Sequence, residues 1–241
     1  MSFNPFHQFE IHPILNLSLD GYDISLTNSS LFMLLAVFLV SSFFYFAGRR
    51  ATIVPGKLQN MAEITIKFVD DMLYESAGSK AKPFFPFIFT LFTFLLALNL
   101  CGMLPYGFSV TSHIAFNFAV AAFIFILVTI TGFVRHGFGF LSLFLPSGAP
   151  LFIAPLLIVI EFFSFISRPI SLSIRLAGNM IAGHVLLGVL GSFVVMMGVY
   201  GIIPMPFMVV MVGFEFFVAI LQAYIFTILT CVYLNDAINL H

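Results

Sequence analysis

Six polar residues recur at helical spacing in the middle of a long apolar run. They are Glu161, Ser164, Arg168, Ser171, Arg175 and Asn179, at steps of 3, 4, 3, 4 and 4. Such steps return to one face of an α-helix, so they predict a polar stripe about 27 Å long at about 1.5 Å per residue. A charge at the centre of a membrane helix costs about 2.5–3.5 kcal/mol, and such residues usually face a cavity or a partner. Arg175 is therefore the first candidate for a functional residue.

Arg175 could act as a permanent positive charge, because a guanidinium does not lose its proton in proteins. A carboxyl of a partner, kept protonated by burial, would be attracted by about 4 kcal/mol at about 4 Å and an effective dielectric constant of about 20. At about 1.36 kcal/mol per unit, that attraction lowers the pKa of the partner's carboxyl by about three. The alternative is that the stripe only packs against neighbouring helices through hydrogen bonds, which would require Ser and Asn but neither Glu nor two Arg.

A second set of polar residues follows the stripe. His184 lies nine residues after Arg175, nearly half a turn round the helix, and therefore suits a position facing the last apolar segment. On that segment Glu215 and Gln222 are seven residues apart and share a face. A His–Glu pair can relay protons near neutral pH. Each of these residues also has a purely structural interpretation. His184 and Glu215 could simply satisfy each other as a buried pair, and Gln222 and Asn179 could form hydrogen bonds between helices. Glu161 could lie at the membrane interface in contact with water, and Arg168 could extend its side chain to the lipid headgroups.

The composition is that of a polytopic membrane protein. The chain is 61% hydrophobic and 8% charged, whereas a soluble domain has about 25% charged residues. No basic patch suggests nucleic-acid binding, and no phosphate-binding loop motif occurs in the sequence. We expect no cofactor, no metal and no catalytic activity in this chain alone.

The hydropathy pattern predicts an all-α fold in one domain, residues 1–241, with a long helical hairpin beside three ordinary spans. The expected spans are residues 30–48, 83–105 and 114–134, and the hairpin consists of residues 151–203 and 207–234. Residues 151–203 greatly exceed the roughly 20 residues that one crossing needs. Two crossings therefore remain open, but the unbroken polar stripe favours one long tilted helix.

Basic residues set the expected orientation. Six of the nine Lys and Arg residues lie within residues 49–82, and residues 1–48 and 83–134 contain none. The positive-inside rule then puts 49–82 inside and the N-terminal segment 1–27 outside. Apolar residues recur at helical spacing from Leu58 to Leu73, which predicts an amphipathic helix on the inner surface; an ordinary helical hairpin packed on its neighbours is the alternative.

The segments SLSIRLAGNMIAGH and FEFFVAILQAYIFTILTCVYLNDAINLH resemble subunit a of F-type ATP synthase, which is subunit 6 of the mitochondrial enzyme. The likeness extends over nearly the whole chain, is densest from Glu161 to His241 and is nearest to the alphaproteobacterial and mitochondrial branch. The resemblance implies a stator subunit of a proton channel, in which the carboxyls of a ring of c subunits pass Arg175 in turn. It also implies contacts with the peripheral-stalk b subunits and the rest of the complex, in a bacterial inner membrane or, alternatively, a mitochondrial one.

The resemblance and the expected orientation together assign candidate roles to the polar residues. The outer proton half-channel would use His184, Glu215, Gln222 and Asn179, with Asn99 as a further member. The inner half-channel would use Glu161, Ser164 and Ser171, with Arg168 as a further member. In the family, one acid and one histidine often occupy the positions of His184 and Glu215, in either order.

Two other classes of membrane protein compete with this interpretation. A self-contained proton- or ion-coupled transporter usually shows inverted repeats and paired broken helices, and the sequence shows neither. A respiratory subunit that binds haem through two histidines would need two facing membrane histidines, and His184 alone lies clearly in an apolar segment.

Overall fold

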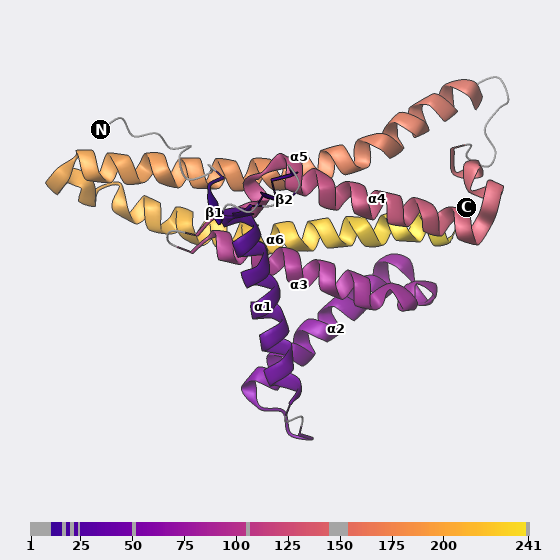
Figure 1. Cartoon of the computed structure of the whole chain (residues 1–241), viewed down its shortest axis with the longest axis horizontal. Helices are drawn as coiled ribbons and strands as arrows, with labels where there is room; N and C mark the ends of the chain where they lie inside the picture. The colour runs from indigo at the N-terminus through magenta and orange to yellow at the C-terminus, as the bar shows by residue number, and fades with distance from the viewer. Residues whose placement is uncertain are drawn as a thin grey trace. The chain divides into compact units, whose positions relative to one another are not determined.

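The computed structural model describes residues 11–15, 18–19, 22–23, 25–49, 52–104, 107–144 and 154–239. The beginning of the predicted outer segment (1–10), the end of the predicted span 83–105 and the beginning of the predicted helix 151–203 lie outside the described residues. Figure 1 shows the order of the elements along the chain.

Six α-helices form the described part of the chain: α1 (Asn28–Gly48), α2 (Lys57–Ala77), α3 (Phe85–Gly102), α4 (Ile114–His136), α5 (Ala154–Met196) and α6 (Met205–Ile238). Short 3₁₀ turns connect them: η2 (Ser79–Phe84), η3 (Val110–Ser112), η4 (Gly137–Phe144) and η5 (Gly198–Ile202). Near the N-terminus, β1 (Pro13–Leu15) pairs antiparallel with β4 (Leu26–Thr27), and β2 (Ser18–Leu19) pairs with β3 (Tyr22–Asp23). Hydropathy did not predict these two small hairpins.

Within the described residues, five helices are long and apolar enough to cross a membrane: Asn28–Gly48, Ser79–Gly102, Ile114–Phe140, Pro155–Met196 and Met205–Ile238. A backbone in hydrocarbon must satisfy its polar groups internally, and helices do so within one segment. The prediction of an all-α polytopic membrane protein is therefore confirmed.

Helix α5 runs without interruption for 43 residues, which corresponds to about 64 Å at about 1.5 Å per residue. It continues through Pro169, although a proline inside a helix removes one backbone hydrogen bond. Beside the proline, the hydroxyl of Ser171 donates to the carbonyl of Arg168 at 3.1 Å, and that of Ser173 donates to Ile170 at 2.9 Å. No turn divides the polar stripe near Arg175, as its periodicity predicted.

The chain forms two compact units that share its long helices. Unit 1 consists of residues 1–53, 93–113 and 176–223, and unit 2 consists of residues 54–92, 114–175 and 224–241. The boundary falls within α3, α5 and α6, so each unit contains one part of each of these helices. The two units are described separately below.

In unit 1, the C-terminal part of α5 and the N-terminal part of α6 run side by side and are joined through η5 (Figure 1). Ala219 and Ala223 on α6 are fully buried, and such small residues let membrane helices approach closely. At the turn, a Cβ at Gly201 would overlap the carbonyl oxygen of Val194, so the sharp return of the chain requires glycine there.

In unit 2, aromatic rings pack the N-terminal part of α5 against α4 and η4. The centroid of the Phe165 ring lies 4.7 Å from that of Phe125 and 6.4 Å from that of Phe140. Such ring pairs contribute about 0.5–1.5 kcal/mol beyond their buried area. On α2, Met72 and Leu73 are buried, whereas Leu58, Met61 and Ile64 are exposed. The apolar residues of α2 are thus divided between a buried group and an exposed group, and its place on the inner membrane surface stays a prediction.

Gly132 provides a test of this packing, because a Cβ there would overlap the buried Phe140 ring. Forcing extra volume into a packed protein interior costs about 1–3 kcal/mol. We expect Gly132→Val to lower the thermal unfolding temperature of the detergent-solubilised protein, measured by circular dichroism. Gly139→Val is the control, since its Cβ would meet open space. Equal unfolding temperatures for the two variants would contradict the packing described here.

Candidate functional site

The polar residues of unit 1 pair across α5 and α6. The amide nitrogen of Asn179 donates to the side-chain oxygen of Gln222 at 2.9 Å. Gln222 is 1% exposed. Its hydrogen bond with Asn179 holds one polar side chain of α5 beside one of α6. Asn99 on α3 is fully buried and donates to the backbone carbonyl of Ala219 at 2.9 Å. These hydrogen bonds satisfy one polar atom of each side chain, whereas Oδ1 of Asn99 and Nε2 of Gln222 are buried without a hydrogen-bond partner among the described residues.

His184 and Glu215 face each other one or two turns further along the same helices. The Nδ1 atom of His184 lies 3.5 Å from Oε1 of Glu215, and the side chains are 15% and 5% exposed. That separation is longer than a well-formed hydrogen bond. Neither carboxylate oxygen of Glu215 accepts a hydrogen bond from a described residue. The pair is therefore buried, in electrostatic contact and open to a further hydrogen-bond donor such as water.

A cavity of about 250 Å³ adjoins this pair, with Asn179, Gly183 and Glu215 in its wall. The rest of the lining is apolar and comes from the same two helices: Ala182, Leu186, Met211, Phe214 and Val218. Room for one water requires only about 10–15 Å³, and a carboxylate and an amide supply polar partners. The cavity can therefore hold several waters in contact with Glu215.

Gly183 makes the approach of Glu215 possible. A Cβ at position 183 would lie 2.7 Å from Oε1 and 3.0 Å from Cδ of Glu215, closer than side-chain carbons and oxygens normally come. Gly183 thus permits a close approach between α5 and α6. At Gly178 and Gly191 a Cβ would meet open space.

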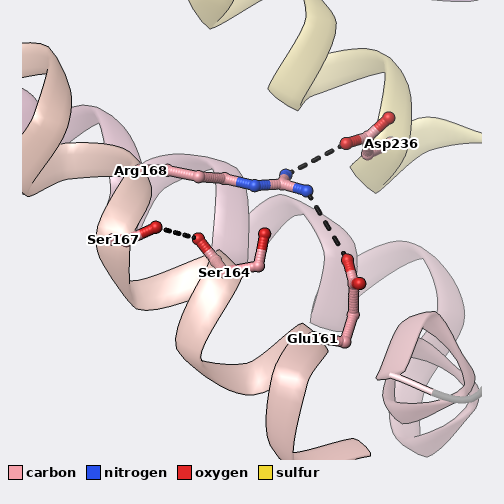
Figure 2. Close-up of polar contacts among 5 residues, drawn as sticks. All are labelled: Glu161, Ser164, Ser167, Arg168 and Asp236. Carbon is pink, nitrogen blue, oxygen red and sulfur yellow. Dashed lines mark hydrogen bonds and ion pairs between the residues drawn. The ribbon is translucent and has the colours of Figure 1, made fainter. Parts of the chain in front are cut away.

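In unit 2, Arg168 lies between two carboxylates (Figure 2). Its Nη1 donates to Oδ2 of Asp236 on α6 at 3.0 Å, and its Nη2 lies 3.9 Å from Oε1 of Glu161 on α5. The guanidinium carbon also lies over the rings of Phe165 and Tyr233, at 5.5 Å and 4.9 Å from their centroids. Arg168 is therefore held by charge and by ring contacts.

The rest of the stripe in unit 2 is not covered by the part of the chain that the structure describes. Ser164, Ser171 and Arg175 are exposed, while Ser173 on the opposite face of α5 is buried. The hydroxyl of Ser171 donates to its own helix, and the backbone carbonyl of Ser164 accepts from Ser167. Among the described residues, Arg175 forms no hydrogen bond or ion pair.

The structure thus joins most of the residues predicted from the sequence into pairs: His184 with Glu215, Asn179 with Gln222, and Arg168 with Glu161. Their roles in proton movement stay predictions. Asp236 and Tyr233 were missed. An acidic residue in the last turn of an apolar helix is an unusual feature that could have indicated Asp236, because the helix dipole disfavours a carboxylate there.

The fold and the ionisable residues along α5 and α6 define a polytopic helical membrane protein that carries charge within its spans. Residues 30–235 match the family model described as the ATP synthase A chain, and the chain belongs to that family. It is accordingly a non-catalytic membrane subunit of the F0 sector and the stator part of its proton channel, next to the c-ring. It resides in an energy-coupling membrane. Family membership favours this role over the self-contained transporter.

Gly183→Ala tests the geometry of the buried pair. The added methyl group would displace the Glu215 carboxyl from His184 and from the cavity, and misplacing a proton-transfer group by about 1 Å can cost about 100-fold in rate. We expect a loss of ATP-driven proton pumping in membrane vesicles with assembled complex. Gly191→Ala serves as the matched control, since its methyl group meets open space on the same helix. Pumping by Gly183→Ala at the control's rate would show that the close approach is unimportant.

Proposed function

We propose that the chain forms two proton half-channels at its interface with the c-ring, and that Arg175 separates them. As each ring carboxyl reaches Arg175, the guanidinium forces that carboxyl to lose its proton. The fixed charge also blocks direct leakage of protons from one half-channel to the other. Proton translocation is thereby coupled to rotation of the ring and to ATP synthesis elsewhere in the complex.

The exposure of Arg175 is the single observation that carries this proposal. The residue lies within an apolar helix, on a face that the described residues leave uncovered, and it has no ionic partner among them. An unpaired charge in hydrocarbon is costly, so a carboxylate supplied by another chain would stabilise it. The c-ring is the neighbour that the family provides.

The chemistry of the guanidinium fits this task better than that of another cation. Arginine stays charged under all physiological conditions, so it cannot carry protons past itself. Its planar fork matches a carboxylate in two hydrogen bonds. A lysine ammonium loses its proton more readily when buried, and would make a weaker barrier to leakage.

The outer half-channel is formed in this proposal by the polar residues of unit 1. The His184–Glu215 pair adjoins a cavity large enough for several waters, and a carboxylate with free hydrogen-bonding capacity can take protons from such waters. Gln222 and Asn179 add further polar groups on α6 and α5, and Asn179 is four residues after Arg175 in the sequence. Asn99 contributes by holding α3 against α6.

The inner half-channel is formed in this proposal by the stripe residues of unit 2. Glu161 has a side chain that is 35% exposed, so it can exchange protons with water. The exposed hydroxyls of Ser164 and Ser171 lie on the same face of α5, between Glu161 and Arg175 in sequence. These hydroxyls can form hydrogen bonds with water molecules along that face.

The wider setting follows from the family resemblance. We infer that the chain contacts the peripheral-stalk b subunits as well as the ring. We also infer that the energy-coupling membrane is a bacterial inner membrane, the mitochondrial inner membrane being the alternative.

Arg175→Ala tests the central claim. We expect ATP-driven proton pumping in vesicles to be abolished, and passive proton flux to be retained or raised, because the barrier between the half-channels is gone. Both are measured by quenching of a pH-sensitive dye. Ile174→Ala, which truncates the exposed neighbouring residue, is the control and should still pump. Intact pumping by Arg175→Ala would reduce the stripe to a packing feature.

Exchanging the two members of the buried pair tests the outer half-channel. His184→Glu alone would place two carboxyls face to face, and Glu215→His alone would place two imidazoles there. Each single change is expected to reduce pumping strongly, because like groups disfavour each other's charged forms. The double variant restores one acid and one base at the observed 3.5 Å and should recover pumping. A double variant as inactive as the single ones would argue against a relay between these two positions.

A further inference from the structure

We propose that Asp236 is a positioning residue of the inner half-channel, which holds the Arg168 guanidinium so that the Glu161 carboxyl stays free to exchange protons. The inference rests on the proposed function, in which Glu161 belongs to the inner path. It assigns a role to a residue one position beyond the segment matched by the family model.

The distances show that the two carboxylates compete unequally for one cation. Asp236 accepts a charge-assisted hydrogen bond from Arg168 at 3.0 Å, whereas Glu161 lies 3.9 Å from the nearest guanidinium nitrogen (Figure 2). The longer separation is outside hydrogen-bond range. Glu161 therefore feels the positive charge without being bound by it.

Two rings hold the guanidinium in this position. Its central carbon lies 4.9 Å from the centroid of the Tyr233 ring on α6 and 5.5 Å from that of Phe165 on α5. Tyr233 is three residues before Asp236, so both contacts come from one face of α6. The Arg168 side chain is 19% exposed. It is packed between the helices and does not extend freely into the lipid headgroups.

The location of Asp236 supports a specific need for a carboxylate there. The residue lies in the last turn of α6, which ends at Ile238. The negative end of the helix dipole disfavours an acid at this place, and Arg168 is the one cation paired with Asp236 among the described residues. The nearby Lys80 and His136 bind Asn239 and the carbonyl of Ile238 instead.

Removing the Asp236 charge would release Arg168 towards Glu161. A guanidinium can bind a carboxylate through two parallel hydrogen bonds, and Glu161 needs to move by only about 1 Å to accept one. A Glu161 carboxylate bound in this way would be slow to take up a proton. The loss of the Asp236 carboxylate on α6 would thus slow proton exchange at Glu161 on α5.

The first experiment measures ATP-driven proton pumping by the whole complex in membrane vesicles carrying Asp236→Asn. We expect the rate to fall about tenfold, which corresponds to about 1.4 kcal/mol of added stabilisation of the Glu161 carboxylate. Asn235→Ala is the matched control on the same turn of α6. It removes the acceptor for Asn239 and should pump at the normal rate. An unchanged rate for Asp236→Asn would overturn the proposal.

The second experiment separates positioning from a purely structural role. In the double variant Asp236→Asn with Arg168→Gln, no guanidinium remains to capture Glu161, and we expect faster pumping than with Asp236→Asn alone. A structural ion pair between α5 and α6 would be broken equally in both variants. If the double variant pumps no faster than Asp236→Asn, the ion pair is structural and the positioning role is wrong.

Glu161→Gln distinguishes this proposal from the function on which it rests. We expect Glu161→Gln to slow pumping, and Asp236→Asn to add no further loss in that background. Normal pumping by Glu161→Gln would show that Glu161 is outside the inner path and would remove both ideas. Slow pumping by Glu161→Gln, with a further independent loss from Asp236→Asn, would leave the half-channel intact and overturn the positioning role alone.

Discussion

The cost of charge in hydrocarbon is the constraint on which the arrangement of this protein depends. Every ionisable side chain within the spans must find a partner, a water-filled cavity or another subunit. Arg168 lies near two carboxylates. His184 and Glu215 contact each other, and Glu215 lines a cavity. Arg175 differs from them, because its face of α5 is left uncovered by the described part of the chain. In the proposed mechanism this exposed face of α5 is the surface that meets the c-ring.

The two groups of polar residues solve the same problem in different ways. In unit 1 the helices approach closely through Gly183, Ala219 and Ala223, and pair neutral amides beside an acid and an imidazole. In unit 2 the ion pair of Arg168 and Asp236 remains partly exposed, and the guanidinium of Arg168 contacts two aromatic rings.

Periodicity along one helix was predictable from the sequence, and contacts between distant segments were not. Helical steps of three and four were enough to find the stripe from Glu161 to Asn179, and the apolar runs were enough to find the five spans. The Arg168–Asp236 contact joins residues 68 positions apart, and no local pattern encodes it. The sequence alone does not distinguish Gly183, which packs against Glu215, from Gly178, where a Cβ would meet open space. The strand pairs before α1 are too short to leave a recognisable alternation.

The exposed guanidinium of Arg175 also has a consequence for the biogenesis of the complex. A newly inserted chain that has not yet met its ring carries a charge in lipid at a cost of several kcal/mol, comparable to the net stability of many proteins, about 5–15 kcal/mol. In the proposed mechanism the ring supplies carboxylates beside Arg175, so the subunit is more stable in the membrane after assembly than before it.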